Sequence, residues 1–317
     1  MDEIIKHFGS RVKTDISFKE LTTLQIGGPA KYFLKVQTEK ELLEIVKIAA
    51  KGNIPYLIVA SGSNLLVSDQ GFDGLVIQNS ISAIEKDDNS ITVKSGTPLQ
   101  DLVNFTLEQG FPGLQKLTGI PGTVGGAVYG NAGAYGQTIS DYLTEVSCFD
   151  GSQKITKTRE NCHFTYRESA FKQSKLIILD IKFTLPKGSR ELLQSEAEKT
   201  LELRLKKYKP GIKCPGSFFK NVLTENLSAE TKNLLPPYKD TFGKIPAWLF
   251  LEGVGGKGAS LGKIKIADFH ANLFINQGDG TAADFWQLAW EYSEKVKEKY
   301  QVQLEPEVQL INLPPLS

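Results

Sequence analysis

The chain has 317 residues, more than one hydrophobic core usually organises, which predicts two or three domains. Its 37 lysines and arginines nearly balance 36 aspartates and glutamates, so the net charge of +1 indicates neither a nucleic-acid groove nor a membrane-surface patch. The opening segment MDEIIKHFGS lacks an apolar run, and no stretch of ~18 apolar residues follows. We therefore expect no signal peptide, no membrane span and a cytoplasmic location.

Cysteine and histidine are few and scattered. Cys148, Cys162 and Cys214 form no C-x-x-C pair, and histidine occurs only at positions 7, 163 and 270. This pattern argues against a disulfide framework, a zinc site or a dithiol redox centre. We expect three ordinary buried or half-buried thiols and no metal.

The first regular elements form a helix followed by a strand. Over residues 38–52 apolar side chains recur at helical spacing, with Thr38 expected as the N-cap, Glu41 completing a capping box and Gly52 ending the helix. The apolar run over residues 54–60 has strand length and breaks into Ser-Gly-Ser-Asn. We therefore expect a buried strand that is followed by a loop of small residues.

A second α+β unit is expected to begin around residue 76. Its first helix should take Thr97 as N-cap and Pro98 as first residue, and should stop at Gly110. A strand is expected over residues 143–150, followed by a hairpin at Asp150-Gly151 and a second strand over 153–158, and the chain should return as a strand over 175–186.

A charged helix over about 190–208 ends at Lys-Pro-Gly, a plausible domain boundary. The segment beyond it has apolar runs of its own and a long terminal helix capped by Thr281. Trp286 and Trp290 on that helix are interpreted as packing or edge residues rather than cofactor contacts.

The segment 110–136 is the richest in glycine, with nine glycines in 27 residues. Such density lets the backbone adopt positive φ and approach a ligand, so that amide N–H groups can converge on phosphate oxygens. A run of tight turns is the alternative. The segment matches neither the G-x-G-x-x-G turn after a strand nor the P-loop. Residues 61–64 offer a second candidate cradle, and two cradles suit a cofactor that contains a pyrophosphate.

Five further motifs and the glycine-rich segment resemble, in order, the UDP-N-acetylenolpyruvoylglucosamine reductase family. They read TTLQIGGPA, SGSNLLVSDQGFDGLVI, GIPGTVGGAVYGNAGAYG, FTYRESAF, PGSFFKN and LEPEVQLI, and they span about residues 22–311. The resemblance implies an α+β chain with a vanillyl-alcohol-oxidase (PCMH-type) FAD-binding fold. Two α+β subdomains, residues 1–75 and 76–208, would bind the flavin. A C-terminal α+β domain, residues 209–317, would bind the substrate and return its last strand towards the flavin.

The same resemblance implies the chemistry. NADPH would reduce FAD, the reduced flavin would pass hydride to the methylene carbon of the enolpyruvyl group of a UDP-sugar, and a proton would reach the neighbouring carbon. The product would be UDP-N-acetylmuramate, a peptidoglycan precursor. No histidine or cysteine lies in the glycine-rich segment to attach the flavin, which indicates non-covalent FAD. We expect a monomer whose partners are the UDP-sugar and NADPH, without nucleic acid or membrane.

The site residues follow from the matching motifs. Arg167 corresponds to the family arginine that binds the substrate carboxylate, Ser217 to the proton donor and Glu307 to a glutamate that assists it. Read without the family, Arg167 is a surface ion-pair partner of Glu168 or Glu160, Ser217 a turn residue and Glu307 an exposed strand charge. The implied substrate contacts are Tyr166, Lys220 and Asn221. The implied flavin contacts are Ser61, Gly62, Ser63, Asn64, Leu65, Gly119, Pro121, Gly122, Thr123, Gly125, Gly126, Asn131, Gly133 and Ala134.

The chain departs from the family pattern in three places, one of which is mild: residues 60–64 read Ala-Ser-Gly-Ser-Asn where many relatives show GGGSN. Gln309 stands where relatives often carry arginine, and Gly130 where they carry methionine. No tyrosine-bearing extra loop is evident, which favours the shorter subclass. Two other functions stay open at this point: a flavin oxidase that acts on an alcohol with oxygen as acceptor, and a nucleotide-sugar binding protein of the same fold without chemistry.

Overall fold

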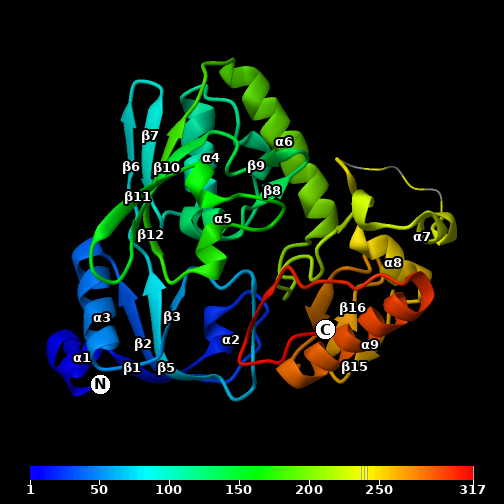
Figure 1. The fold of residues 1–317 in the computed structure, drawn as a ribbon, viewed down its shortest axis with the longest axis horizontal. Helices are drawn as coiled ribbons and strands as arrows, with labels where there is room; N and C mark the ends of the chain where they lie inside the picture. Colours follow the sequence, from blue (N-terminus) through cyan, green and yellow to red (C-terminus); the bar gives the residue numbers. More distant parts are fainter. Residues whose placement is uncertain (237, 239, 241, 317) are drawn as a thin grey trace. The chain divides into compact units, whose positions relative to one another are not determined.

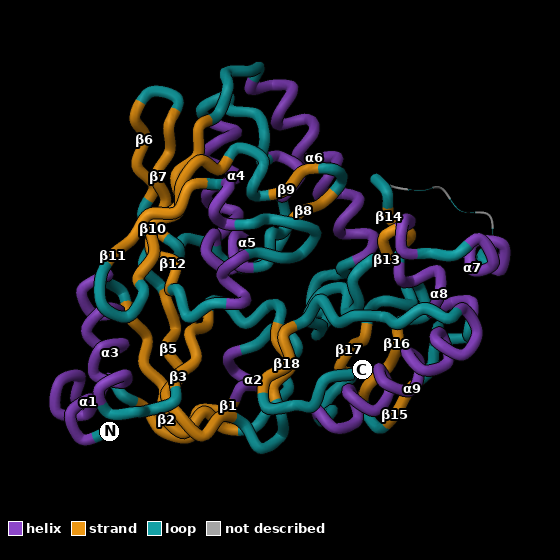
Figure 2. Tube along the Cα trace, viewed as in Figure 1, coloured by secondary structure: helices purple, strands orange, loops and turns teal. Residues whose placement is uncertain are grey.

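The computed structural model describes residues 1–236, 238, 240 and 242–316. The chain alternates between two compact units. Unit 1 comprises Met1–Thr14, Tyr32–Ser61 and Asp73–Lys206, and unit 2 comprises Asp15–Lys31, Gly62–Phe72 and the chain from Lys207 onward. Figures 1 and 2 show helices and strands interspersed along both, so the predicted α+β class is confirmed. The three-part division at residues 75 and 208 stays a prediction.

Most strands of two sheets belong to unit 1. The four-stranded sheet has the order β1-β2-β5-β3, with β3 and β5 parallel, and the five-stranded antiparallel sheet has the order β11-β10-β12-β7-β6. The strands are β1 (Lys13–Ser17), β2 (Pro29–Val36), β3 (Tyr56–Val59), β5 (Phe72–Asn79), β6 (Ile84–Asp87), β7 (Ser90–Lys94), β10 (Leu143–Phe149), β11 (Lys154–Thr158) and β12 (Ile177–Thr184), with the small hairpin β8 (Gly133–Ala134) and β9 (Gln137–Thr138). The helices are α1 (Asp2–Phe8), α3 (Glu39–Lys51), α4 (Leu99–Glu108), α5 (Val124–Tyr129) and α6 (Arg190–Lys207).

The five-stranded sheet buries one face against helices. Alternate residues of β7 and β12, such as Ile91, Val93 and Ile181, share a core with the apolar faces of α4 and α5, which lie beside the sheet in Figure 1. Successive side chains of a strand point to opposite faces, so Lys94 and Asp180 face the other way and form an ion pair of 2.5 Å. The two-residue period of these strands thus separates an apolar face from a charged one.

The charged face is joined to α3. Thr38 caps this helix and Glu41 completes the capping box, and Gly52 follows it, all as predicted. Glu39, the first helical residue, forms ion pairs with Lys94 and Lys154. Burial opposes the charge on Glu39, but hydrogen bonds from the two lysines outweigh it and lower the pKa of the carboxyl. The helix N-terminus is thereby tied to the five-stranded sheet.

One predicted helix start is wrong. The helix α4 begins at Leu99 with Pro98 as its N-cap, not at Pro98 with Thr97 as cap. The Thr97 hydroxyl donates to the Ala83 carbonyl and accepts from the Ala83 N–H, both at 3.2 Å, so it is unavailable to the helix amides. The predicted hairpin at Asp150-Gly151 is confirmed between β10 and β11.

Unit 2 has a core of aliphatic residues and a cluster of aromatic rings, which involves α9 and a three-stranded sheet of order β15-β16-β17. Phe218 lies 4.8 Å from Phe219 and 5.0 Å from Phe285, measured between ring centroids. The elements are α2 (Phe18–Leu21), β4 (Leu65–Val67), β13 (Val222–Leu223), α7 (Ala229–Leu234), β14 (Lys244–Ile245), α8 (Ala247–Gly253), β15 (Ser260–Leu261), β16 (Ile264–Ile266), β17 (Phe274–Asn276), α9 (Ala282–Tyr300) and β18 (Gln309–Ile311).

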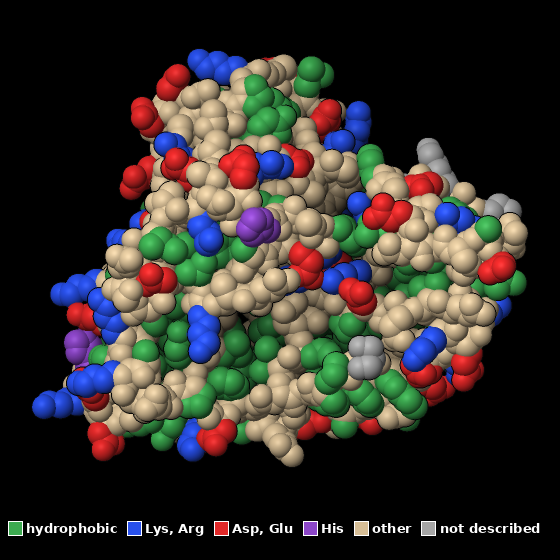
Figure 3. Space-filling model, viewed as in Figure 1, with side chains coloured by type: hydrophobic (Ala, Val, Ile, Leu, Met, Phe, Trp, Pro, Cys, Tyr) green, Lys and Arg blue, Asp and Glu red, His purple; other side chains and the backbone are tan. Residues whose placement is uncertain are grey.

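The predicted cap and packing of the terminal helix are confirmed. The Thr281 side chain accepts from the Asp284 N–H at the start of α9. Trp286 stacks on Trp290 with 6.2 Å between centroids and donates to the Pro314 carbonyl at 3.0 Å, so both rings serve packing at the helix edge. Figure 3 shows cationic and anionic side chains interspersed over the face in view, as the near-neutral composition predicts. Within the described ranges, no helix is long and apolar enough to cross a membrane.

Candidate active site

The glycine-rich segment folds into turns around the short helix α5 in unit 1. Thr123 caps this helix by accepting from the Gly126 N–H at 3.3 Å. Gly125 is buried, and a Cβ there would meet the Cβ of Ser95 at 2.7 Å and its carbonyl oxygen at 2.8 Å. Gly126 is exposed instead, and a Cβ there would meet nothing closer than 3.6 Å. One glycine is therefore required by packing, while its neighbour leaves bare backbone on the surface.

Arg167 lies against the end of the same segment. It donates to the carbonyl oxygens of Gly133 at 2.9 Å and Asn131 at 3.5 Å, and its guanidinium carbon lies 5.4 Å from the centroid of the Tyr166 ring. Its φ of 59° is in the left-handed region, which costs a residue with a side chain roughly 1–2 kcal/mol. Glu168, the expected ion-pair partner in the surface reading, forms an ion pair of 3.3 Å with Lys172.

Asn131 supplies an orphaned acceptor beside Arg167. Its side chain is 5% exposed and donates through Nδ2 to the Thr165 carbonyl at 2.7 Å. Its Oδ1 is buried and has no hydrogen-bond partner among the described residues. Because an unpaired buried acceptor costs ~1–3 kcal/mol, this atom fits a site whose donor arrives with a bound molecule.

In unit 2 the Ser217 hydroxyl is held by two side chains. The Lys207 ammonium donates to Ser217 Oγ at 3.0 Å, and the Tyr208 hydroxyl lies 3.2 Å from the same oxygen. The sequence did not single out either partner, because Lys207 lies in a lysine-rich stretch without distinguishing spacing. A cation next to the hydroxyl stabilises negative charge on its oxygen.

Ser217 and Glu307 are brought together by main-chain pairing. The Glu307 N–H donates to the Phe218 carbonyl at 2.7 Å, and Phe219 and Pro306 form an antiparallel bridge. The Glu307 carbonyl in turn accepts from Asn64 Nδ2 at 3.1 Å. The segments of Ser217 and Glu307, about 90 residues apart, thus pair through main-chain hydrogen bonds. Asn64 of the small-residue loop bonds to the second of these segments.

His270 lies near this cluster. Burial, and then the positive charges of Lys207 and Lys257, lower the pKa of His270 to about 3. Its Nδ1 accepts from the Asn272 N–H at 3.2 Å. The ring is therefore neutral at ordinary pH, and the positive charge next to Ser217 comes from lysine.

Two of the remaining predicted substrate residues contact other parts of unit 2. Lys220 forms an ion pair of 3.2 Å with Glu305, and Asn221 Oδ1 accepts from the Ala247 N–H at 3.2 Å. Gln309, where relatives often carry arginine, donates through Nε2 to the Glu307 carbonyl at 3.3 Å.

The remaining predicted flavin residues fall in both units. Ser61 ends a segment of unit 1, whereas residues 62–65 belong to unit 2. Gly62 is buried, and a Cβ there would meet the Leu21 carbonyl at 2.0 Å. The methionine position of relatives, Gly130, is the C-cap of α5. The structure therefore places Arg167 and the glycine-rich segment in unit 1, and Ser217, Glu307 and Asn64 in unit 2.

The three cysteines are free and buried, as predicted. Burial raises the pKa of the Cys162 thiol to about 11, which argues against thiolate chemistry there. Among the described residues, no group of three or more His, Cys, Asp or Glu side chains is arranged to hold a metal ion.

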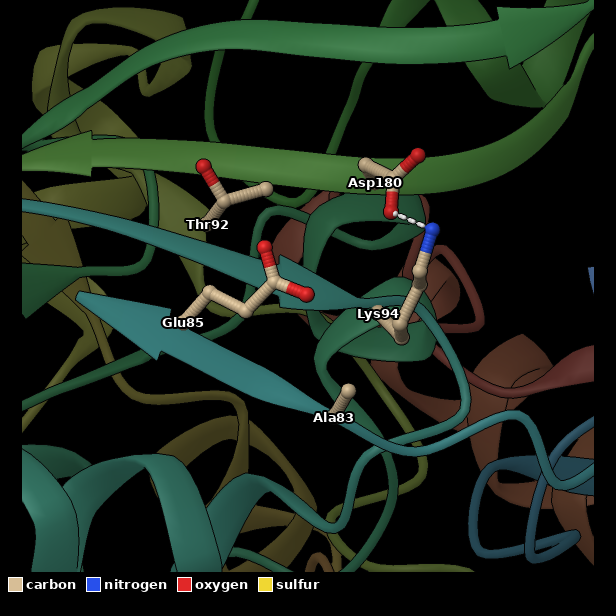
Figure 4. A pocket seen from close by; sticks show the side chains of 5 residues that line it. All are labelled: Ala83, Glu85, Thr92, Lys94 and Asp180. Carbon is tan, nitrogen blue, oxygen red and sulfur yellow. Dashed lines mark ion pairs between the residues drawn. The ribbon is translucent and has the colours of Figure 1, made fainter. Parts of the chain in front are cut away.

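A small hollow on the charged face of the five-stranded sheet is separate from all of these residues. Its volume is about 140 Å³, and Figure 4 shows the ion pair between Lys94 and Asp180 across one side of it. Ligand pockets usually measure ~300–1,000 Å³. The hollow is too small for a flavin or a nucleotide sugar.

Two protein-family models match the chain. The sequence model described as "FAD binding domain" matches residues 30–159, which makes the chain an FAD-binding protein. The model described as "UDP-N-acetylenolpyruvoylglucosamine reductase, C-terminal domain" matches residues 207–311.

Relatives match over nearly the whole chain. UDP-N-acetylenolpyruvoylglucosamine reductase of Solibacter usitatus is 39% identical over 92% of this chain and 93% of its own length. The Thermotoga maritima enzyme is 33% identical over 91% and 95%. The crystal structure of the Thermus caldophilus enzyme superposes with a TM-score of 0.75 at 30% identity, covering 95% of this chain and 99% of that chain. The chain belongs to the UDP-N-acetylenolpyruvoylglucosamine reductase family, and the predicted FAD-dependent oxidoreductase is confirmed.

Proposed function

We propose that three residues carry the chemistry by which this chain reduces the enolpyruvyl group of UDP-N-acetylglucosamine enolpyruvate to UDP-N-acetylmuramate. Ser217 donates the proton, Glu307 assists it, and Arg167 binds the substrate carboxylate. The observation that carries the proposal is the 3.0 Å hydrogen bond from the Lys207 ammonium to Ser217 Oγ. NADPH and FAD supply the hydride chemistry when bound.

The flavin is proposed to lie on the bare backbone around α5. Exposed Gly126 and the buried acceptor of Asn131 fit a large polar ligand, because the first admits close approach and the second needs a donor. The small-residue loop of residues 61–65 provides the second cradle. The absence of a cysteine or histidine from residues 110–136 supports non-covalent binding.

Ser217 can act as an acid only with help. A serine hydroxyl is a weak acid, and proton donation from a side chain is efficient when its pKa approaches that of the accepting carbon. The Lys207 cation stabilises the alkoxide that forms as the proton leaves, and Tyr208 can supply a second hydrogen bond. The carbon that receives the proton is the one next to the carbon that receives hydride.

Arg167 suits the carboxylate for two reasons. Its planar fork of donors matches a carboxylate, which becomes more basic as negative charge builds during reduction. Its left-handed backbone is a strained position that the chain keeps although a glycine would relieve it. Tyr166, Lys220 and Asn221 are proposed as further substrate contacts.

The proposal extends to the organisation and setting of the whole chain. The enzyme is proposed to work as a monomer in the cytoplasm, on small-molecule partners alone. The flavin-binding subdomains are proposed to be residues 1–75 and 76–208, and the substrate domain residues 209–317. The near-neutral charge, with 37 cationic and 36 anionic side chains, supports the absence of nucleic-acid and membrane partners.

Ser217→Ala tests the proposal in two half-reactions of the FAD-loaded enzyme. Stopped-flow absorbance should show flavin reduction by NADPH at the normal rate. Reoxidation of the flavin by the enolpyruvyl UDP-sugar should slow by at least ~10²-fold, the scale of one proton-transfer group. Ser260→Ala, an exposed serine of β15, is the control and should leave both rates unchanged. Reoxidation at the normal rate in Ser217→Ala would remove Ser217 from the mechanism.

A further inference from the structure

The segment that carries Ser217 is held by a buried amide from another part of unit 2. The Phe218 N–H donates to the Asn272 carbonyl at 3.0 Å. The Phe219 N–H donates to Asn272 Oδ1 and the Phe219 carbonyl accepts from Asn272 Nδ2, both at 2.8 Å. Asn272 thus pairs with this segment as a neighbouring strand would, through its side chain as well as its backbone.

The other edge of the same segment pairs with the main chain at Glu307. Of the four main-chain groups of Phe218 and Phe219, three bond to Asn272 and the fourth, the Phe218 carbonyl, bonds to the Glu307 N–H. Asn272 therefore lies across the segment from Glu307, and the segment between them sets the distance from Ser217 to the glutamate.

The two sides of Ser217 differ in how tightly they are packed. Gly216, the residue before the serine, has φ 92°, and a Cβ there would meet nothing within 4 Å, although Cys214 and Pro215 before it are buried. Phe218 and Phe219, after it, are 0% and 1% exposed. Lys207 and Tyr208 contact the Ser217 hydroxyl itself, whereas the backbone that follows the serine is fixed by the hydrogen bonds of Asn272.

We infer that Asn272 is a positioning residue for the reduction: its side-chain amide clamps Phe219 and thereby holds Ser217 in line with Glu307 and Lys207. The inference rests on the proposed role of Ser217. Displacing a reacting group by ~1 Å can cost ~10²-fold in rate, so a clamp two residues away has a measurable effect.

Asn276 offers a matched control in the same unit. It is 5% exposed against 2% for Asn272. Its Nδ2 donates to the Leu24 carbonyl at 3.1 Å, and its Oδ1 accepts from two glycine N–H groups at 3.0 Å. Removing either amide leaves buried main-chain groups unpaired, but of the two side chains only that of Asn272 bonds to Phe219, two residues after Ser217.

The experiment compares Asn272→Ala, Asn276→Ala and Ser217→Ala as FAD-loaded enzymes. Both asparagine variants should lower the urea midpoint. Only Asn272→Ala should slow flavin reoxidation by the enolpyruvyl UDP-sugar, by ~10- to 10²-fold, with flavin reduction by NADPH unchanged. Added to Ser217→Ala, it should slow reoxidation by less than about threefold further, since coupled residues are not additive.

Asn272→Asp provides a second readout if the alanine variant fails to fold. A protonated carboxyl can donate and accept like the amide, whereas the carboxylate cannot donate to the Phe219 carbonyl. The reoxidation rate relative to wild type should therefore rise as pH falls from about 8 to about 5.5. His270, whose Nδ1 accepts from the Asn272 N–H, has its pKa lowered to about 3 and stays neutral over this range.

The outcomes distinguish the role of Asn272 from the role of Ser217. Slow reoxidation in Ser217→Ala with normal reoxidation in Asn272→Ala would overturn the positioning role and leave Ser217 in place. Normal reoxidation in Ser217→Ala would overturn the role of the serine, and the inference with it. Equal slowing in Asn272→Ala and Asn276→Ala would show a general loss of stability and would also overturn the inference.

Discussion

Replacing Lys207 by methionine removes the cation at Ser217 while keeping most of the aliphatic stem. The ammonium donates to Ser217 Oγ at 3.0 Å, and hydrogen bonds to charged groups are worth about 1.5–3 kcal/mol. Since about 1.36 kcal/mol is a factor of ten in rate, the full value predicts a slowing of about 10- to 150-fold. Only the increase in the strength of this hydrogen bond as the Ser217 oxygen loses its proton affects the rate, so the slowing of about 150-fold is an upper bound.

The assay is again flavin reoxidation by the enolpyruvyl UDP-sugar, with flavin reduction by NADPH as the internal reference. Lys207→Met should slow the first and leave the second unchanged. In the Ser217→Ala background it should add less than about threefold, because the two groups act through one hydrogen bond. Lys265→Met, which removes an ion pair of 2.7 Å with Asp268, is the control. Full additivity of the Lys207 and Ser217 effects, or equal slowing of flavin reduction, would refute the reasoning.

Two further predictions concern the proposed flavin site around α5 and the stability of the protein in acid. Gly125→Ala should lower the urea midpoint by the equivalent of ~1–3 kcal/mol, because its Cβ would overlap Ser95. Gly126→Ala should fold normally and weaken FAD binding by about tenfold, as measured by flavin fluorescence titration. Normal FAD affinity in Gly126→Ala would place the flavin elsewhere. His270, with its folded-state pKa lowered to about 3, binds no proton in the folded state until that pH, whereas the unfolded chain binds one below about 6.5, so stability falls as pH drops through that window. Between about pH 7 and 5, His270→Gln should lose less stability than wild type, by at most about 2 kcal/mol in urea unfolding. The control is the exposed His7→Gln. A plot of stability against pH for His270→Gln that runs parallel to those of wild type and the control would contradict the prediction.

Local signals in the sequence were sufficient where one short segment determines its own geometry. The capping box of Thr38 and Glu41 and the cap at Thr281 were predictable because both partners lie within three residues of each other. Thr97 shows where this fails. Its side chain satisfied the cap pattern, but Ala83, fourteen residues earlier, takes its hydrogen bonds.

The candidate site also contains some residues that the sequence predicts and others that it does not. Motif order was enough to select Arg167, Ser217 and Glu307 as the residues to test. It was not enough to find Lys207 or Asn272, since the first is one of several neighbouring lysines and the second lies in an apolar run. Their contacts exist only once separate stretches of chain are packed together.

Residues close along the chain were enough to establish the class of elements, the glycine-rich segment and the family. Folding was needed to show that the small-residue loop bonds to Glu307 through Asn64, that a lysine holds the Ser217 hydroxyl, and that Asn272 clamps Phe219. The difference arises from the separation of the partners in sequence. Asn64 and Glu307 are 243 residues apart, and no local pattern predicts that packing brings their polar atoms to 3.1 Å.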